Sequence, residues 1–462
     1  MAVTGNACTN TDAHACLLSN LIDRQSRQHV PRPLFLVLLI VTTPVIFIFD
    51  GPIIHGLVIA AAAVSAAIVA LRSRPGEAGF LSTVTRLMAI IAAIPALWML
   101  FQVLPLKTVG LAHPIWESAA AALGRPLAGS ISIDPGATLI SFARYLSAVV
   151  IAFVAAAVAI DRRRAEWVLF ALTAATTIIA LMVLAAGLGN FTFLSKSIGS
   201  PASAATTDSA GLGIILAVAT ALYTIERAKT QQLGQGESAV WLRLTSAACL
   251  IAVAICSLAV FVGATSQTYF AVSYGVATFA VAIVGRRFRL GPWGYSAIVS
   301  VALVVGITAV ALQPRRQTMD LTLAFAARAP APLIAVTQRV LTETRWTGTG
   351  VGTFAAVLPI YRDIDELATG SIAPTAAAEI AVELGRPFLW AILMAAMALD
   401  LTLLRGAVRR GRDSFYSMAG ASSTVAITLL AFGNMGLFST PVLVIAAAAV
   451  GIAIAQSKSR SI

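Results

Sequence analysis

The stretch Trp346-Thr-Gly-Thr-Gly-Val-Gly-Thr-Phe354, followed by Pro359-Ile-Tyr-Arg362, lies in the longest polar interval of this sequence, residues 313–384. Apolar runs fill most of the chain on both sides of it. The interval carries seven acidic residues and six arginines: Asp320, Glu343, Asp363, Asp365, Glu366, Glu379 and Glu383, with Arg315, Arg316, Arg328, Arg339, Arg345 and Arg362. Any chemistry that the protein performs is therefore expected in this interval.

The composition is that of a membrane protein. Of the 462 residues, 58% are hydrophobic and 11% are charged, whereas a soluble domain carries about 25% charged residues. A transmembrane helix needs about 20 mostly apolar residues and satisfies its own backbone hydrogen bonds in lipid. We therefore expect an all-α, polytopic integral membrane protein embedded in a lipid bilayer.

Twelve apolar runs are long enough to be candidate spans, and one long loop precedes the tenth. The connections within the first pair and within the last pair are very short, so re-entrant hairpins are an alternative there. The expected spans are residues 33–49, 53–71, 87–103, 137–160, 167–188, 209–225, 244–264, 268–285, 294–312, 386–404, 416–437 and 441–455.

Arginine and lysine follow a one-sided pattern across these spans. With the N-terminus placed in the cytoplasm, 21 of the 32 basic residues fall in inward connections and nine in outward ones, while Arg144 and Arg386 lie at or inside span ends. The positive-inside rule then puts both termini in the cytoplasm. The chain divides into a cytoplasmic tail (1–32), a bundle of about nine helices (33–312), an extracytoplasmic loop (313–384), and C-terminal helices with a short cytoplasmic tail (385–462).

Several classes of function find no support. The net charge of +12 comes from short loops between apolar runs, so no basic face indicates nucleic acid. Four cysteines and four histidines are scattered without metal-ligand spacing, and no metal or cofactor is expected. Tryptophans fall near expected span ends, as is typical of membrane interfaces, except Trp98, which lies deeper in the third span.

Two ionisable residues fall inside expected spans. Arg144 lies seven residues into the fourth span, where a charge indicates function unless its long side chain reaches the headgroups. Asp400 lies near the inner end of the tenth span, five residues before Arg405. A structural ion pair with Arg405 or a position at the membrane interface accounts for this charge without a functional role.

The polar interval itself offers three candidates for chemistry. Successive amides around Gly348, Gly350 and Gly352 could form an anion-binding nest that suits a pyrophosphate-linked lipid, or simply a tight turn. A dinucleotide loop is excluded because no βαβ unit surrounds these glycines. Guanidinium groups could clamp phosphate, unless they pair with nearby acidic residues; the candidates are Arg339, Arg345 and Arg362.

Glu379 and Glu383 are four residues apart and share a face if their segment is helical. One of them could act as a general base. The alternative is a solvated face on an amphipathic helix that leads into the tenth span.

Three stretches, in order, resemble a known family. The first is Phe101-Gln-Val-Leu-Pro-Leu106 with Ile131-Ser-Ile-Asp-Pro-Gly-Ala-Thr138, and the second is Thr347-Gly-Thr-Gly-Val-Gly-Thr-Phe354 with Pro359-Ile-Tyr-Arg362. The third is Val382-Glu-Leu-Gly385. These stretches, their order and the long outer loop are similar to those of the O-antigen ligase and O-antigen/exopolysaccharide polymerase superfamily of bacterial membrane glycosyltransferases. The resemblance covers roughly residues 87–404.

The resemblance implies a function at the bacterial inner membrane. Such enzymes transfer a glycan from an undecaprenyl-diphosphate carrier to a sugar hydroxyl, on lipid A-core or on another repeat unit, without a nucleotide sugar or a metal. It implies Arg362, which matches the family's loop arginine, as the diphosphate clamp. Glu379 and Glu383 join it as catalytic candidates because either could serve as the base. The substrate-binding candidates are Arg144, Arg345, Gly348, Gly350, Gly352 and Tyr361.

The sequence also departs from the family pattern. Pro374, followed by Thr375, stands where the family has the histidine of its His-Asn motif, and Gln267 stands where an arginine often follows serine. A usual base and a usual phosphate ligand are thus replaced. Alternatives are a non-catalytic member of a glycan assembly complex, and a polysaccharide or lipid-glycan transporter or flippase.

Overall fold

The computed structural model describes residues 34–49, 51–72, 75–105, 110–187, 200–231, 238–287, 320–326, 329–362, 372–409 and 414–458. Within these ranges the chain is helical, and its only β-type pairing is an isolated bridge between Pro105 and Ser130. The all-α, multi-pass membrane architecture expected from composition is confirmed.

Ten helices in the described ranges are long and apolar enough to cross a membrane. They match ten of the expected spans, because each apolar run has the length that a membrane span requires. They are α4 (Pro52–Arg72), α5 (Pro75–Val103), α7 (Pro135–Val158), α8 (Arg162–Gly187), α10 (Ser200–Gln231), α11 (Ser238–Gly263), α12 (Ser266–Arg287), α17 (Arg386–Arg409), α18 (Ser414–Gly433) and α19 (Thr440–Ser457).

The first expected span is broken into α2 (Leu34–Val41) and α3 (Thr43–Ile48). Pro44 lacks the N–H that would donate to the carbonyl of Ile40, so the helical ladder is interrupted there. The hydroxyl of Thr43 donates to that carbonyl instead, at 2.7 Å. The last pair forms two full-length helices rather than a re-entrant hairpin, and the expected span at 294–312 lies outside the described residues.

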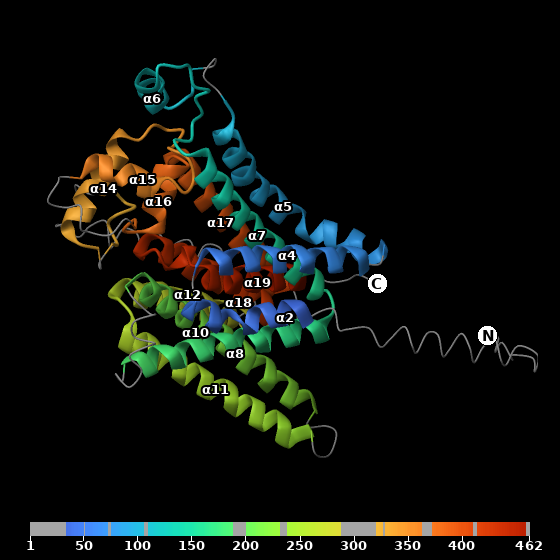
Figure 1. The fold of residues 1–462 in the computed structure, drawn as a ribbon. Helices are drawn as coiled ribbons and strands as arrows, with labels where there is room; N and C mark the ends of the chain where they lie inside the picture. The colour runs from blue at the N-terminus through green and yellow to red at the C-terminus, as the bar shows by residue number, and fades with distance from the viewer. Residues whose placement is uncertain are drawn as a thin grey trace, which may run out of the picture.

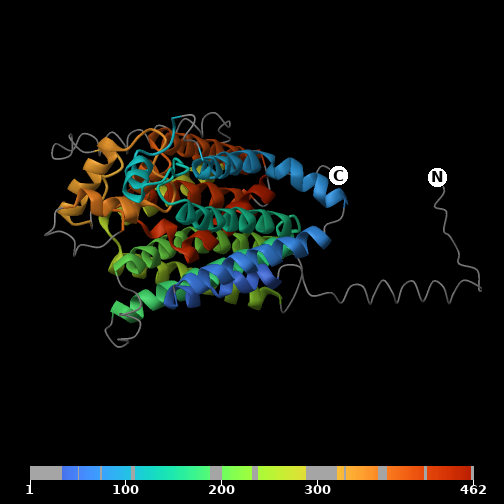
Figure 2. The same cartoon turned by 45° about the horizontal axis from the view of Figure 1, so that its top comes forward.

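The bundle is organised around α18, which packs against α10, α12, α17 and α19 (Figures 1 and 2). In the most apolar part of both α10 and α18, 78% of residues are buried within the protein, against 17% in α4 and α17. Glycine, alanine and serine dominate α18, and such small residues let helix backbones approach closely in lipid. The central helices therefore carry the packing, while α4 and α17 lie at the periphery.

Helices α4, α7 and α19 begin at the same end of the bundle (Figure 1). At the opposite end, Gln456 near the end of α19 donates to the carbonyl of Ala159 after α7, and Lys458 donates to the carbonyl of Thr83 at 3.0 Å. The first of these ends is covered by the polar interval, and we call it the loop end.

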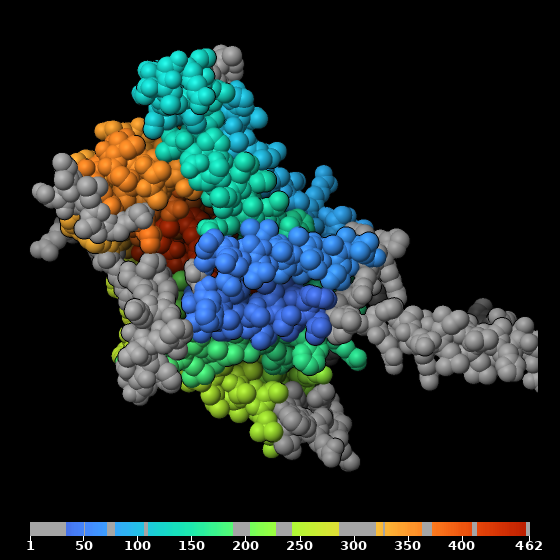
Figure 3. All heavy atoms as spheres, in the orientation of Figure 1, coloured from blue at the N-terminus to red at the C-terminus, as the bar shows by residue number. Residues whose placement is uncertain are grey.

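The polar interval folds into a small helical unit, here called the capping domain (the described residues from 320 to 384). Its elements are α14 (Ala331–Glu343), α15 (Phe354–Val357), the 3-10 helix η2 (Leu358–Tyr361) and α16 (Ala376–Glu383). They enclose their own apolar core, which includes Val336, Phe354, Leu358, Ala381 and Val382. Helix α6 (Ile115–Leu123) lies at the same end of the bundle (Figures 1 and 3). The 3-10 helix η4 (Gly436–Phe438) also lies there, where it contacts α16.

Candidate functional site

The glycine-rich turn pairs with the end of α16. Gly348, Gly350 and Gly352 have φ angles of 75°, 101° and 80°, in the left-handed region that favours glycine. The amide of Thr349 donates to the carbonyl of Val382 at 3.0 Å, and that of Gly350 to the carbonyl of Glu383 at 3.1 Å. A side chain at Gly348 would collide with the carbonyl of Glu383, so only glycine allows this close approach.

The carboxylate of Glu383 fills the anion position of this turn. Its side chain is 4% exposed, and its Oε1 accepts a hydrogen bond from the amide of Phe354 at 3.0 Å. The backbone amides of Gly352 and Thr353 also hydrogen-bond this carboxyl. Burial raises the pKa of Glu383 to about 7, and these amides oppose the rise. The amides expected to cradle a diphosphate thus serve Glu383 here, and diphosphate binding by the three glycines stays a prediction.

Gln102 connects the third expected span to this turn. It is fully buried, and its Nε2 donates to the carbonyl of Thr347 at 3.0 Å and to that of Glu383 at 2.9 Å. Nearby, the indole N–H of Trp98 donates to the carbonyl of Leu384 at 3.2 Å, and its ring stacks on Phe388 with centroids 4.6 Å apart. These contacts hold the capping domain to α5.

The start of α7 holds the other side of the turn. The amide of Ile133 donates to the carbonyl of Thr349 at 3.0 Å, and Gly350 lies directly against Ser132. Asp134 caps α7 by accepting from the amide of Ala137 at 3.0 Å, as is typical of an N-cap carboxylate. The three stretches that carry the family resemblance therefore meet in one place.

Glu379 lies one turn before Glu383 on α16 and is half-buried. Burial raises the pKa of Glu379 well above its ordinary value, and the negative charge of Glu383 adds to the rise. Among the residues that the structure describes, no side chain hydrogen-bonds or ion-pairs with the Glu379 carboxyl. Neither glutamate lies on a fully solvated face, which was the alternative reading of the sequence.

The arginine candidates of the capping domain lie apart. Arg345 is exposed, and its Nη1 lies 3.5 Å from the carbonyl oxygen of Ala112 in the segment before α6. Burial lowers the pKa of the neighbouring His113, and the charge of Arg345 lowers it further. Arg362 is half-buried and ends η2. Tyr361 packs on the apolar core, where burial first, and then its hydrogen bond to Glu343, raise its pKa.

The positions that depart from the family pattern have structural contacts. Thr375 caps α16 by accepting from the amide of Ala378 at 3.1 Å, and its hydroxyl donates to the carbonyl of Thr322 at 2.7 Å. Pro374 beside it is buried. At the start of α12, Gln267 accepts a hydrogen bond from the hydroxyl of Ser266 at 3.1 Å. Thr375 thus fixes the start of α16, the helix that carries both Glu379 and Glu383.

Arg144 lies in a separate pocket on α7. Its Nη2 is 2.5 Å from the Nδ1 of His55 on α4. The capping domain reaches α7 one turn earlier, where Gly352 lies against Ser141. Asp400, the other ionisable residue noted in the sequence, lies on α17, and its Oδ1 is buried without a hydrogen-bond partner among the described residues.

Sequence reasoning missed several residues of this region. Gln102 and Ser132 stand inside the stretches that carry the resemblance, but no role was assigned to them. The depth of Trp98 in its span was the one visible signal, and its bond to the carbonyl of Leu384 explains that depth. The pairing of His55 with Arg144 has no signal in the sequence, because 89 residues separate them.

The described residues contain no group of three or more His, Cys, Asp or Glu side chains that could hold a metal ion. No protein-family model matches the chain, and no curated protein matches it.

Proposed function

We propose that the protein is a membrane glycosyltransferase of surface polysaccharide assembly, resembling O-antigen ligases and polysaccharide polymerases. It would move a glycan from an undecaprenyl-diphosphate carrier to a sugar hydroxyl, at the extracytoplasmic side of a bacterial inner membrane. One observation carries the proposal. Three stretches that are far apart in sequence and resemble the family meet through the contacts of Gln102, Thr349 and Glu383.

The two glutamates take different parts in this proposal. Glu379 is partly exposed, and burial and the charge of Glu383 raise its pKa, so it takes up a proton more readily than an ordinary carboxylate, as a general base must. Glu383 is buried beneath the glycine-rich turn and acts as a positioning residue. It fixes the turn, and with it the segment that leads to Arg362.

The proposed step is a substitution at the anomeric carbon of the donor. The acceptor hydroxyl oxygen forms the new glycosidic bond, the bond from that carbon to the diphosphate breaks, and undecaprenyl diphosphate leaves. Glu379 accepts the proton of the hydroxyl. Arg362 stabilises the negative charge that develops on the leaving diphosphate, because a guanidinium fork matches phosphate oxygens.

A glycan profile tests the proposal. The gene is deleted in the source bacterium and complemented with wild type, Glu379→Gln, Arg362→Ala or Arg125→Ala, and surface and lipid-linked glycans are compared. Loss of long chains with build-up of single lipid-linked repeat units identifies a polymerase. Build-up of long lipid-linked chains identifies a ligase. Arg125 is an exposed arginine near α6, so Arg125→Ala is the matched control and should restore the profile.

One structural observation favours a second candidate, a non-catalytic member of a glycan assembly complex. The turn amides are already paired inside the chain, and Thr375 caps α16 near the place of the family's histidine. Full complementation by both Glu379→Gln and Arg362→Ala, with a defect only on deletion, would support this candidate and exclude the catalytic one.

A further inference from the structure

Helix α16, which carries Glu379, has a second attachment to the bundle. It is eight residues long, and a helix of this length is not stable by itself in water. Gln102 and the glycine-rich turn hold its C-terminal end. At its N-terminal end, the amide of Ala376 donates to the backbone carbonyl of Asn434 at 3.0 Å. Asn434 directly follows α18, so the start of α16 is bonded to the bundle itself.

The side chain of Asn434 is fixed by two hydrogen bonds. Its Nδ2 donates to Oδ1 of Asp208 on α10 at 3.0 Å, and its Oδ1 accepts from the amide of Gly436 at 2.7 Å. An amide side chain provides a donor group and an acceptor group, and this position uses both. A side chain at Gly436 would collide with the other carboxyl oxygen of Asp208. Glycine therefore allows α10 and η4 to approach this closely.

Asp208 is an acidic residue inside a membrane span. It is fully buried, and it lies in the apolar part of α10, Ala204–Arg227. A buried carboxyl group is costly unless hydrogen-bond donors meet it, and an ionisable residue within a span by default indicates function. Because α10 is one of the two most buried helices of the bundle, Asp208 ties Asn434 to the centre of the molecule.

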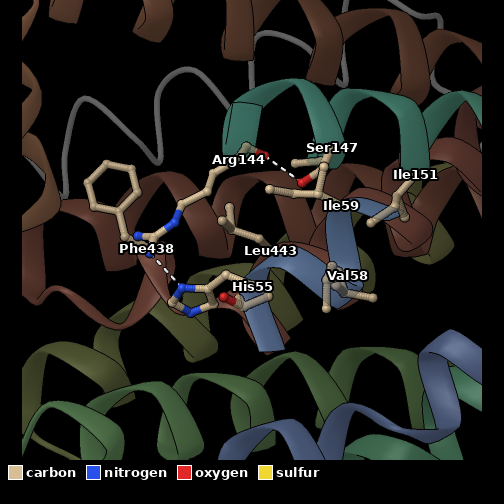
Figure 4. A pocket seen from close by; sticks show the side chains of 11 residues that line it. His55, Val58, Ile59, Arg144, Ser147, Ile151, Phe438 and Leu443 are labelled. Atoms are coloured by element: carbon tan, nitrogen blue, oxygen red, sulfur yellow. Dashed lines mark hydrogen bonds between the residues drawn. The ribbon is translucent and has the colours of Figure 1, made fainter. Parts of the chain in front are cut away.

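The junction between α18 and α19 has contacts on two sides. Its helix η4 ends at Phe438, which lines a small pocket together with Arg144 and His55 (Figure 4). Met435 packs against the apolar core of the capping domain. The junction therefore touches the bundle on one side and the capping domain on the other, with Asn434 between them.

We infer that Asp208 and Asn434 are positioning residues for Glu379. Asp208 holds the amide group of Asn434, and the carbonyl of Asn434 sets where α16 begins. Glu379 lies in the first turn of α16, so a shift of the helix start moves its carboxyl group. A displacement of about 1 Å can cost on the order of a hundredfold in rate. The role for Glu379 rests on the proposed function, whereas the link from α10 to α16 does not.

The first test is amide hydrogen exchange of the purified full-length protein, followed by mass spectrometry on peptides that cover residues 372–384. Asn434→Asp sets two carboxyl groups against each other. Exchange in α16 should become about tenfold faster, because a hydrogen bond to a charged group is lost. Asn434→Ala adds no charge and should change exchange in the same direction, which covers the case that Asn434→Asp does not fold.

A double variant and a matched control make the result specific. Asp208→Asn combined with Asn434→Asp restores one donor and one acceptor with their places exchanged, and exchange in α16 should return to within about twofold of wild type. Thr220→Val removes a buried 2.8 Å hydrogen bond between α10 and Thr173 on α8. It should leave exchange in α16 unchanged.

Surface glycan per folded protein, measured in the complemented deletion strain, separates positioning from stability. Asn434→Asp should lose at least about tenfold, the double variant should recover, and Thr220→Val should keep the wild-type amount. Unchanged exchange in Asn434→Asp, or no recovery in the double variant, overturns the inference. Glycan that falls only in proportion to folded protein overturns it too, because the role is then structural. Faster exchange in Asn434→Asp, with full glycan from both Asn434→Asp and Glu379→Gln, keeps the link from α10 to α16 and rejects the proposed function.

Discussion

The side chain of Glu383 accepts a hydrogen bond from the backbone amide of Phe354 at 3.0 Å, inside the apolar core of the capping domain. The carboxyl group thus occupies, from within the chain, the position where successive amides after a glycine-rich turn would attract an anion. Its backbone carbonyl meanwhile accepts from Gly350 and Gln102. One residue therefore joins the turn, α16 and α5.

Replacing Glu383 by alanine should destabilise the capping domain. The amides of Thr353 and Phe354, both buried residues, would be left without this acceptor, at a cost on the order of 3 kcal/mol. Trypsin cleavage of the purified protein should then become faster after Arg345 and Arg362. Glu379→Ala is the control on the same helix, and it should change the cleavage rate little because no described side chain bonds to Glu379. Equal cleavage of the two variants would contradict the positioning role of Glu383.

Stability should also depend on pH through Glu383. Its pKa of about 7 in the folded protein exceeds the ordinary 4.5, so the folded state keeps a proton that the unfolded state loses between these values. The stabilisation is complete below about pH 4.5 and is lost as pH rises through about 7. The free energy of unfolding should fall by on the order of 3 kcal/mol across this window.

Thermal unfolding followed by tryptophan fluorescence, from pH 5 to pH 8, measures this dependence. Glu383→Gln cannot titrate and should remove the part of the slope that belongs to Glu383, while the part that belongs to Glu379 remains. Glu379→Gln should keep the slope that belongs to Glu383. A wild-type melting temperature that rises between pH 5 and pH 7 would show that the carboxyl is charged in the folded state.

The sequence predicted the helices well because a membrane span is a local property. Ten apolar runs of sufficient length became ten long helices, and the break between α2 and α3 is caused by Pro44, which is visible in the sequence. The capping domain was expected only as a polar loop. Its core forms from alanines and scattered aliphatic residues. In a polar interval, their spacing does not predict a folded unit.

The candidate site could be predicted only in part. The spacing of Glu379 and Glu383 showed that they share a helix face, but not which of them would be buried. That depends on contacts with residues distant in sequence, such as Gln102, which lies 281 residues before Glu383. The pattern of a single sequence does not predict which distant residues will be in contact. Only the depth of Trp98 in its expected span indicated a contact of this kind.

Gly348→Ala should disrupt the docking of the turn. Alanine at this position meets two penalties, the positive φ of 75° and a collision with the carbonyl of Glu383. Gly124→Ala is the matched control, because Gly124 has a φ of 63° and open space around it. Each variant pays about 1–2 kcal/mol for the left-handed backbone. Only Gly348→Ala also suffers the collision, so it should lower the melting temperature substantially more than Gly124→Ala. Equal decreases in melting temperature for the two variants would contradict the close packing of Gly348 against Glu383.

Gln102→Leu should loosen the capping domain from α5 without unfolding the bundle. Leucine has a similar volume but leaves the carbonyls of Thr347 and Glu383 without the Nε2 donor, at about 1–3 kcal/mol. Trp98 and Trp346, with ring centroids 6.4 Å apart, lie across this junction and report it through fluorescence. The variant should show a shifted tryptophan emission and faster trypsin cleavage after Arg345, while its helix content by circular dichroism equals that of wild type. Thr83→Val, at the opposite end of α5 on an exposed hydroxyl, is the control and should leave both signals unchanged. An unchanged emission in Gln102→Leu would show that Trp98 and the glycine-rich turn hold the domain without the glutamine.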